Sequence, residues 1–507
     1  MNGKIHFIFS IVVIGRSQLI KESDEPMIKA SFKEYGLSSE LLKAIHLLNY
    51  EIPTKVQQQV IPAVLEKKDI IVKSQTGSGK TAAFAIPICQ LVDWEENKPQ
   101  ALVLTPTREL AMQVREDFFN VGRFKRLKVS AIYGKAPFYN QQKELKQKTH
   151  VVVGTPGRVI DHMERGTLEL SNIGYLVIDE ADEMLNMGFI EQIQTIIAGL
   201  PEQRVTLLFS ATMPADIRLL CEKYMKAPIH VEIEAESLTV DTICQERYNV
   251  EEKDKPGLLR DITIVENPDS SIIFCNTKQR VDQVYDDIRR MGYACKKIHG
   301  GMEQTDRTKV MHEFKHGYFR YLVATDVAAR GIDIDNISLV INYDIPRDGE
   351  RYVHRIGRTG RASRSGKAVT FVARDEEGFL KDICKYIGKE IDLKERPEPD
   401  TVSGSKQEFD EKISVAPEIR ETKGVQLSKD IMKLHVNAGK KTKMRPVDIV
   451  GTICSIEGMT AADIGIINIL DVSTFVEILN NKGEAVLEKL QEKPIKGRLR
   501  KVTKVEM

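Results

Sequence analysis

The segment DIIVKSQTGSGKT, residues 69–81, decides the fold class of this chain. A buried strand is predicted at its apolar start, and a helix is predicted to begin near Lys80. Gly77 and Gly79 let the backbone curl between strand and helix, so that successive N–H groups can face one bound anion. The positive end of the helix dipole lies at the same place. A strand, a glycine-rich loop and a helix in this order predict a phosphate-binding loop in a parallel α/β sheet.

Two side chains of this loop have predicted chemical roles. Lys80 would hold the outer phosphates of a nucleotide, and Thr81 would bind Mg²⁺. The first residue of the loop, Ser74, stands where the general pattern has a glycine. The alternative is a Gly/Ser turn beside a chance Gly-Lys-Thr, which the strand–loop–helix context disfavours. We expect nucleotide contacts from Ser74, Gln75, Thr76, Gly77, Ser78, Gly79, Lys80 and Thr81.

Outward from this loop, short apolar strands alternate with amphipathic helices. This alternation fills residues 27–236 and restarts over residues 237–394, which predicts two α/β domains whose parallel sheets are covered by helices on both faces. The expected strands of the first domain are 69–73, 101–105, 128–133, 150–154, 175–179 and 204–210. Those of the second domain are 271–275, 295–299, 321–325, 338–342 and 367–372.

The rest of the chain divides into a linker and a small domain. Residues 395–430 begin with a stretch rich in Pro, Ser and charge that shows no sustained periodicity, so we expect a linker there. Residues 431–507 show strands and helices in the order βαββαβ, which predicts a small α+β domain of the RNA-recognition-motif type. Its expected strands are 433–436, 465–469, 474–479 and 499–503, and its expected helices are 446–455 and 484–490.

Composition limits the class of protein. Of the 507 residues, 42% are hydrophobic and 29% are charged, which excludes a wholly disordered or fibrous chain. Lys+Arg (74) and Asp+Glu (73) nearly balance, but residues 431–507 hold 13 basic and 9 acidic residues, a net charge of +4. This excess suggests a polyanion-binding module, although it also fits ordinary variation. The seven cysteines form no CxxC pair, which fits a reducing compartment.

The first 26 residues need a separate interpretation. Ile5–Gly15 is an apolar stretch of eleven residues, whereas a membrane span needs ~20. The sequence Gly15-Arg16-Ser17 that ends it is a poor signal-peptide cleavage site. We therefore expect residues 1–26 to be a non-native or disordered extension of a cytoplasmic protein.

A second motif, Asp-Glu-Ala-Asp at residues 179–182, directly follows an apolar run. A carboxylate at the carboxyl end of a buried strand lies where Mg²⁺ must be bound beside a phosphate loop, which is the role expected of Asp179. Glu180 would polarise the attacking water. Such a tetrapeptide alone more often marks a solvated acidic surface, but its place after a buried strand and downstream of the loop favours the catalytic interpretation.

Together with these two motifs, the stretch from residue 32 to about 370 resembles the DEAD-box RNA helicases. The resemblance implies two RecA-like domains that bind ATP, Mg²⁺ and RNA across a shared cleft. An adenine-reading Q motif is expected, because an amide suits the edge of adenine and an aromatic ring suits its face. The residues that resemble this motif are Phe32, Tyr50, Lys55 and Gln57.

The resemblance also implies contacts with the sugar–phosphate backbone of RNA. In the first domain they would come from Pro106, Thr107, Arg108, Gly134, Thr155, Pro156, Gly157 and Arg158. In the second domain they would come from Asn276, Arg280 and Thr325. A Gly-Gly pair of the family is Gly134-Lys135 here, so that Lys135 offers a charge where the family has a close backbone approach.

Further matches imply ATP contacts and coupling. Gly331 and Asp333 would contact ATP, and the expected coupling residues are Ser210, Thr212, Asp326 and His354. Arg358 and Arg361 lie three residues apart, so on a helical turn both could reach one phosphate and stabilise the charge of phosphoryl transfer. Because these arginines belong to the second domain, the active site is expected to be complete only when the two domains close. The expected catalytic residues are Lys80, Asp179, Glu180, Arg358 and Arg361.

The segment Lys433–Ile469 resembles the C-terminal RNA-binding domain of DbpA-type bacterial DEAD-box proteins. The resemblance implies recognition of a hairpin of 23S ribosomal RNA and a role in assembly of the large ribosomal subunit. A dense basic loop suited to phosphate contacts is formed by Lys440, Lys441, Lys443 and Arg445. The stacking aromatics of ordinary RNA-recognition motifs are missing, and Phe475 is expected in the core.

The sequence is therefore interpreted as that of an ATP-dependent RNA helicase that locally unwinds 23S rRNA in pre-ribosomal large-subunit particles. ATP and Mg²⁺ are the expected cofactors, RNA is the expected partner, and neither membrane nor DNA is expected. The expected oligomeric state is a monomer. Two alternatives stay open: an ATP-gated RNA clamp for which unwinding is incidental, and an RNA chaperone that binds RNAs indiscriminately.

Overall fold

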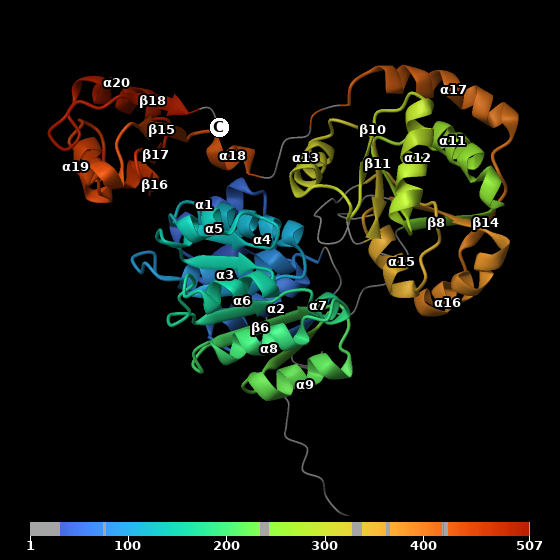
Figure 1. The fold of residues 1–507 in the computed structure, drawn as a ribbon, viewed down its shortest axis with the longest axis horizontal. Helices are drawn as coiled ribbons and strands as arrows, with labels where there is room; N and C mark the ends of the chain where they lie inside the picture. The colour runs from blue at the N-terminus through green and yellow to red at the C-terminus, as the bar shows by residue number, and fades with distance from the viewer. Residues whose placement is uncertain are drawn as a thin grey trace, which may run out of the picture.

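Two parallel sheets and one antiparallel sheet make up the computed structural model, which confirms the predicted fold class (Figure 1). The structure describes residues 31–74, 78–233, 243–326, 337–360, 366–417, 419 and 424–505. Some predicted features lie outside the described residues: the extension over 1–26, Gln75, Thr76, Gly77, Gly331, Asp333 and Arg361. In the part of the chain that is described, no helix is long and apolar enough to cross a membrane.

The first domain is built on a seven-stranded parallel sheet in the order β3-β4-β2-β5-β6-β1-β7. Its strands are β1 (Ile70–Lys73), β2 (Ala101–Leu104), β3 (Val129–Ile132), β4 (Val151–Gly154), β5 (Tyr175–Ile178), β6 (Val205–Ser210) and β7 (Ile229–Glu232). Strands β1 to β6 confirm the predicted ones to within one residue at each end. Strand β7 lies at the sheet edge and is mostly part-exposed, so its sequence lacks the continuous apolar run of the others.

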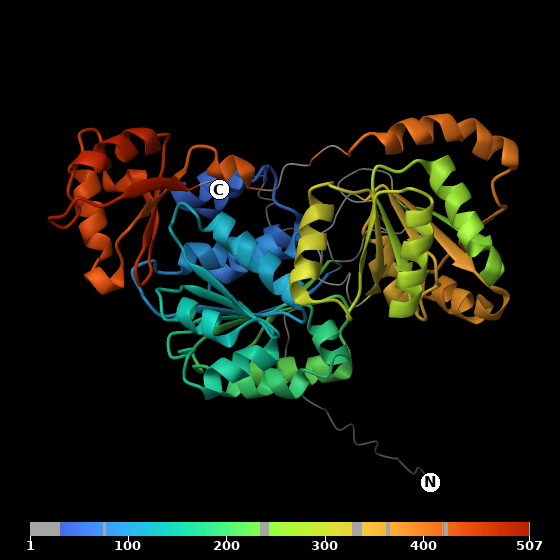
Figure 2. The same ribbon diagram turned by 45° about the horizontal axis from the view of Figure 1, so that its top comes forward.

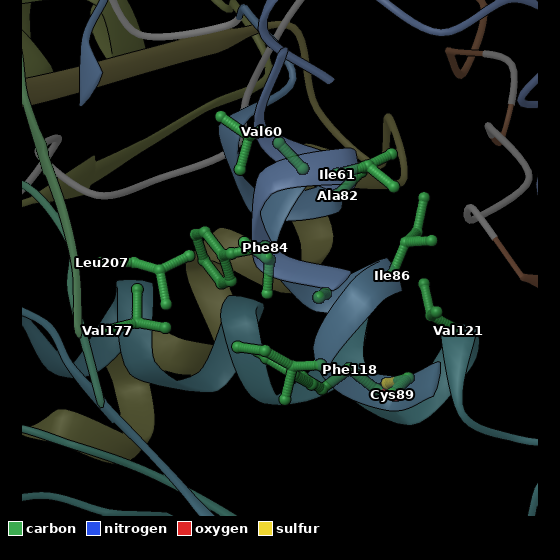
Figure 3. Packing of buried hydrophobic residues seen from close by; sticks show 14 of the residues in the cluster. Val60, Ile61, Ala82, Phe84, Ile86, Cys89, Phe118, Val121, Val177 and Leu207 are labelled. Atoms are coloured by element: carbon green, nitrogen blue, oxygen red, sulfur yellow. The ribbon is translucent and has the colours of Figure 1, made fainter. Parts of the chain in front are cut away.

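Helices cover both faces of this sheet, because alternate side chains of each strand point to opposite faces. On one face lie α1 (Ser39–Leu47), α2 (Lys55–Leu65), α3 (Lys80–Leu91) and α4 (Arg108–Val121). On the other lie α6 (Pro156–Glu164), α7 (Ala181–Asn186), α8 (Ile190–Ala198) and α9 (Ala215–Tyr224). The domain also holds η1 (Phe32–Tyr35) and α5 (Phe138–Leu145). Figure 3 shows Phe84 of α3 beside Leu207 and Phe118; its ring centroid is 5.8 Å from that of Phe118.

The second domain repeats this architecture with the strand order β10-β11-β9-β12-β13-β8-β14. Its strands are β8 (Ile243–Asn249), β9 (Ser271–Cys275), β10 (Cys295–Ile298), β11 (Tyr321–Thr325), β12 (Leu339–Asn342), β13 (Gly366–Val372) and β14 (Asp392–Lys394). Its helices are η2 (Glu252–Asp254), α11 (Lys255–Glu266), α12 (Lys278–Arg290), α13 (Gln304–Lys315), α15 (Gly349–Ile356), η3 (Arg374–Glu376) and α16 (Glu377–Ile387). Strand β14 at the sheet edge and its neighbour β8 are additions to the predicted set.

The expected linker over residues 395–430 is wrong in its first half. Residues Pro399–Ser414 form helix α17, which lies against α11 (Figure 1). Phe409 is fully buried, with its ring centroid 5.1 Å from that of Tyr293. The Lys412 ammonium also donates to the carbonyl of Asn267, at 2.6 Å. One buried aromatic residue in a polar sequence therefore fixes this segment to the second domain.

The third domain is an antiparallel sheet in the order β16-β17-β15-β18, with two helices packed on one face. Its elements are β15 (Met432–Val436), η4 (Lys440–Thr442), α19 (Pro446–Cys454), η5 (Ala461–Asp463), β16 (Ile464–Ile469), β17 (Thr474–Ile478), α20 (Gly483–Glu492) and β18 (Val502–Val505). The predicted order βαββαβ is confirmed, although the last strand begins three residues later than expected. A short helix, α18 (Val425–Ser428), precedes the domain.

The prediction that Phe475 lies in the core of the third domain is wrong. Its neighbour Val476 is fully buried on the helix-covered face, so Phe475 points to the opposite face of the sheet. There its ring centroid is 5.0 Å from that of His435, and the Lys433 ammonium lies 5.3 Å from the ring centroid. This open face therefore has one aromatic pair and a cation.

Candidate functional site

The phosphate loop holds its lysine in a buried position. Lys80 is the first residue of α3, and its ammonium donates to the carbonyl of Ser74 at 3.2 Å. The N-cap of this helix, Gly79, has a φ of +89°, a left-handed value that favours glycine. The N-terminus of α3 thus holds a buried cation beside Ser74, which suits an anionic group.

The Q-motif segment packs directly on this loop. The Thr54 hydroxyl donates to the carbonyl of Ser78 at 2.9 Å, and the Gln57 amide donates to the carbonyl of Gly79 at 3.3 Å. A Cβ at Gly79 would lie only 2.7 Å from the Gln57 amide nitrogen, so glycine is required for this contact. Thr54 also caps α2 by accepting from the Gln57 N–H, a role that a Thr three residues before Gln could have signalled.

The predicted aromatic residues of the Q motif lie in different environments. Phe32 is only 3% exposed and belongs to the core cluster of the first domain, and its contact with adenine stays a prediction. Tyr50 is half-buried at the edge of the same cluster. Lys55 is exposed in the first turn of α2. Of the two rings, Tyr50 is therefore the better placed to meet a base.

Two carboxylates follow strand β5 at its carboxyl end. Asp179 is buried and accepts a hydrogen bond from the Glu180 N–H at 3.0 Å. Glu180 has a φ of +53°, a costly value for a residue with a Cβ. This conformation lies between the end of β5 and the start of α7.

Burial raises the pKa of both carboxyl groups. For Glu180 the pKa rises to about 7, with the Asp179 charge as the next cause, while Lys80 and Arg358 oppose the rise. For Asp179 the rise has the same main cause and Lys80 again opposes it. Two adjacent carboxylates short of positive charge suit a hard cation with oxygen ligands, so the residues present fit Mg²⁺.

The last residue of the Asp-Glu-Ala-Asp motif ties this site to the end of β6. One carboxylate oxygen of Asp182 accepts from the N–H groups of Ala211 and Thr212, at 2.9 and 2.8 Å. The Thr212 hydroxyl donates to the same oxygen at 3.1 Å, and the Ser210 hydroxyl accepts from the Asp182 N–H at 3.2 Å. The expected coupling residues Ser210 and Thr212 are therefore in direct contact with the acidic motif through Asp182, which the sequence did not single out.

The second domain reaches the same acidic motif. Nδ1 of His354 lies 3.5 Å from a carboxylate oxygen of Glu183. Arg358 is buried and close enough to lower the pKa of Glu180. The structure therefore brings three predicted residues together across the domain boundary: Glu180, His354 and Arg358.

Arg355 holds helix α15, which carries His354 and ends two residues before Arg358. It is 2% exposed, and its guanidinium forms two hydrogen bonds with Asp326, at 2.5 and 2.9 Å. It also donates to the side chain of Asn276 at 2.8 Å. The Asn276 amide in turn donates to the carbonyl of Ile345 at 3.0 Å. Both ends of this amide, which was expected to bind RNA, are therefore bonded within the domain.

The expected RNA residues of the first domain meet helix α13 of the second. Arg108 donates to the Gln304 side chain at 2.9 Å, and Gln304 donates to Glu109 at 3.2 Å. Arg307 completes the contact, with Nη2 2.7 Å from Glu109. Burial lowers the pKa of Arg108, so this cation lies in a partly dry boundary between the domains.

The other predicted RNA residues of this domain lie nearby. Arg158 donates to the carbonyl of Ala136 at 3.1 Å and to the Gln141 side chain at 2.8 Å. A Cβ at Gly134 would be 3.9 Å from the Arg108 guanidinium. Lys135, which replaces a glycine of the family, keeps a glycine-like φ of +57° and is exposed. Thr155, Pro156 and Gly157 form the N-terminal end of α6 beside them.

The remaining predicted residues lie in the second and third domains. Arg280 is paired with Glu252, and Thr325 ends β11 in a buried position. The basic loop of the third domain is exposed, and its backbone is held by N–H bonds from Lys440 to Leu470 and from Lys441 to Asp471, both 2.8 Å. A Cβ at Gly439 would lie 2.2 Å from the Leu470 carbonyl, so only glycine permits this loop.

Comparison with known families agrees with this layout. Residues 54–220 match the model of the DEAD/DEAH box helicases, and residues 254–363 match the helicase conserved C-terminal domain. Residues 433–504 match the DbpA RNA binding domain.

Two proteins named as RNA helicases are similar in sequence to most of this chain. The ATP-dependent RNA helicase DbpA of Bacillus subtilis is 58% identical over 473 residues, which cover 93% of this chain and 99% of that protein. The DEAD-box ATP-dependent RNA helicase CshA of Geobacillus kaustophilus is 47% identical and matches 73% of this chain and 79% of its own.

A solved structure shares the arrangement of the two parallel-sheet domains. Saccharomyces cerevisiae Dbp5 bound to RNA and ADP BeF3 matches 75% of this chain and 99% of its own, with a TM-score of 0.68 and 34% identity. The chain therefore belongs to the DEAD-box ATP-dependent RNA helicases of the DbpA type, enzymes whose ATPase is stimulated by RNA.

Proposed function

We propose that this RNA helicase acts on 23S ribosomal RNA during assembly of the large ribosomal subunit, as a cytoplasmic monomer. The observation that carries the proposal is the DbpA RNA binding domain over residues 433–504, joined in one chain to both helicase domains. Its exposed basic loop supplies charge for phosphate contacts, which give affinity without fixing the sequence. The target is therefore selected by the third domain, and the first two domains do the unwinding.

In this proposal, ATP is bound and hydrolysed between the first two domains. Lys80 and the N-terminus of α3 hold the phosphates, and Glu180 accepts a proton from the attacking water. Arg358 neutralises charge that develops on the transferred phosphoryl group. Mg²⁺, held by Asp179 and Thr81, would supply further neutralisation of phosphate charge when bound.

Hydrolysis is coupled to RNA through two connected sets of bonds. Asp182 links the acidic motif to the Ser-Ala-Thr segment at the end of β6. Arg355 links helix α15, which carries His354 and ends two residues before Arg358, to Asn276, which directly follows β9. A change in the nucleotide is thus transmitted to both RNA-facing surfaces by contacts already present.

An unwinding experiment tests this function. A short RNA duplex is joined to the 23S hairpin, and strand release is measured with and without ATP, alongside a matched duplex that has a scrambled hairpin. We expect ATP-dependent release that is faster for the natural hairpin. Equal release from both substrates contradicts the rRNA target and favours an indiscriminate chaperone. Tight binding without ATP-dependent release favours an RNA clamp.

A further inference from the structure

A buried ion pair joins the first and third domains. Nη2 of Arg123, just after α4, lies 3.4 Å from Oε1 of Glu477 in β17. The two residues are 6% and 8% exposed. The Arg123 guanidinium also lies 5.0 Å from the centroid of the Phe119 ring. Charges of this kind are costly to bury unless they are paired, so neither residue is expected to be buried without the other.

The third domain holds Glu477 in position for this pair. Its other carboxylate oxygen accepts from the Ile466 N–H at 3.3 Å. On the neighbouring strand, a Cβ at Gly465 would lie 2.9 Å from Cβ of Glu477 and 3.0 Å from that second oxygen. Glycine at this position therefore leaves the space in which the Glu477 side chain lies. One oxygen is bonded within the domain and the other faces Arg123.

Two further cations of the first domain bond to backbone carbonyls of the third. Arg126 donates to the carbonyl of Ala461 at 2.6 Å, and Lys128 donates to that of Ile467 at 2.7 Å. Ile467 belongs to β16, an edge strand that pairs with β17 on one side and with no strand on the other. An unpaired strand edge needs a cover in a stable protein, and here Lys128 provides part of it.

The segment that leads into the third domain is also held on the first. Helix α18 lies against α1 (Figure 2), and its Leu427 is 2% exposed. Gly424, just before this helix, has a φ of +99°, and a Cβ there would lie 3.2 Å from the Asn120 side chain of α4. Asp430, just after it, accepts from the Asn481 side chain at 2.9 Å. The connection is thus anchored at both of its ends.

These contacts leave another part of the third domain uncovered. The basic loop over Lys440–Lys443 is exposed, and the ring of Phe475 stays half-buried beside His435. The loop lies close enough to the first domain for the Lys440 charge to act on Lys128. The Lys128 pKa falls to about 8, mainly through burial and then through Lys148 and Lys440. A polyanion at the loop would therefore meet cations of both domains.

From these contacts we propose that the third domain is docked on the first as a fixed unit. The docking surface of the third domain is Glu477, the edge of β16 and the carbonyl of Ala461; that of the first domain is Arg123, Arg126 and Lys128 with α1. The occupant of each surface is the other domain of the same chain. RNA consequently approaches the third domain from the side of its basic loop. The docking itself does not depend on which RNA the protein binds.

A charge-swap series in the full-length chain tests the docking. Arg123→Glu and Glu477→Arg each place like charges in contact and should undock the domain, whereas the double variant restores an opposite pair. The readouts are the radius of gyration from small-angle X-ray scattering and hydrogen exchange of peptides that cover 120–129 and 464–469. We expect each single variant to increase the radius of gyration and to speed exchange in both peptides at least tenfold. The double variant should reverse most of both changes.

Two further variants keep the test decisive. Glu477→Gln preserves the size of the side chain and removes only its charge, so it should loosen docking without disturbing the sheet. Lys504→Glu, which breaks the exposed pair with Glu484 in the same domain, is the matched control and should leave both peptides unchanged. Single variants that exchange and scatter like the unmodified protein would overturn the proposal. So would a double variant that stays as expanded as the singles.

Discussion

The first domain has two interfaces, and they are built from different chemistry. Toward the second domain it presents Arg108 and Glu109, whose partners Gln304 and Arg307 lie on helix α13. These bonds join side chain to side chain. Toward the third domain it presents cations that bond mostly to backbone carbonyls, together with one buried pair.

The difference separates an interface that ligands can rearrange from one that they leave in place. At the first interface Arg108 is an expected RNA contact, so bound RNA would compete with Gln304 for the same guanidinium. Residues of the second interface belong to no motif expected to bind RNA or ATP. A side-chain bond to a backbone carbonyl also tolerates sequence change on the partner, since every residue has a carbonyl. We therefore expect bound ligands to replace the side-chain bonds between the first and second domains. We expect them to leave the docking surface in place.

The largest expected effect isolates the chemistry of the cleft. Glu180→Gln should lower RNA-stimulated ATP hydrolysis by ~10²–10⁴-fold, because the amide cannot accept the proton of the attacking water. Binding of ATP and RNA should persist. Steady-state ATPase and equilibrium binding check both statements. The matched control is Glu232→Gln, which breaks an exposed pair with Lys73. A Glu180→Gln variant with the full hydrolysis rate would show that another group is the base.

The second effect concerns the pH dependence of the region beside the docking surface. His150 is 1% exposed, accepts from the Lys128 N–H at 2.7 Å and bonds to the Trp94 carbonyl at 3.0 Å. Burial lowers its pKa to about 4. Because the folded state favours the neutral ring, its contribution is present above the unfolded pKa of ~6.5 and is lost as pH falls toward 4. Between pH 7.5 and 5.0 the loss should be about 2 kcal/mol.

The lone tryptophan makes this measurement selective. Trp94 belongs to the first domain, so its fluorescence during urea unfolding reports that domain within the full chain. His150→Gln should reduce the stability difference between pH 7.5 and 5.0 by about 2 kcal/mol. Part of the difference should remain, since burial lowers the pKa of His162 to about 4 as well. An unchanged difference in the variant would mean that His150 does not titrate in this range.

A third, smaller effect connects docking to activity. Arg123→Glu should raise the concentration of hairpin RNA that half-saturates the ATPase by about tenfold, because an undocked domain presents its RNA at a lower effective concentration. Affinity for the hairpin itself should fall less, since the basic loop is outside the docking surface. The comparison uses hairpin RNA and hairpin-free RNA in parallel. Equal shifts for the two RNAs would indicate damage to the cleft rather than undocking.

The smallest effect sharpens the interface with the second domain. Gln304→Ala removes two hydrogen bonds, each worth about 1 kcal/mol, and releases Arg108. If RNA competes for Arg108, half-saturating RNA should fall about threefold. Gln407→Ala, on exposed helix α17, is the control and should change nothing. Weaker RNA binding in Gln304→Ala would show instead that the contact supports the RNA-competent arrangement.

The sequence predicts buried strands well because they consist of continuous apolar runs. Every residue of β2 and β4 is buried, and both strands are found within one residue of their expected ends. The edge strands β7 and β14, and β8 beside β14, carry mixed or exposed sequences, so periodicity gives no signal for them. Helix α17 depends on distant contacts, such as those of Phe409 with Tyr293 and of Lys412 with Asn267, which local sequence does not reveal.

The candidate site likewise has residues that the sequence predicts and residues that it does not. Lys80, Asp179 and Glu180 are predictable because each occupies a fixed place relative to a strand end. The partners that hold the site are nonlocal: Asp182 with Thr212, and Arg355 with Asp326 and Asn276. The docking surface had no sequence signal at all, because an arginine that bonds to a carbonyl looks like any surface arginine. Phe475 was misassigned because local sequence does not reveal which face of its strand the two helices cover.

Helix α17 has a further consequence for how far the cleft can open. It ends at Ser414 on the second domain, and α18 begins at Val425 on the first, so ten residues span the two bodies. Fully stretched, they reach at most ~40 Å. The same two domains are also joined directly in the chain, since the first domain is described up to residue 233 and the second from residue 243. During an ATP cycle the first and second domains can therefore separate only as far as these ten residues reach.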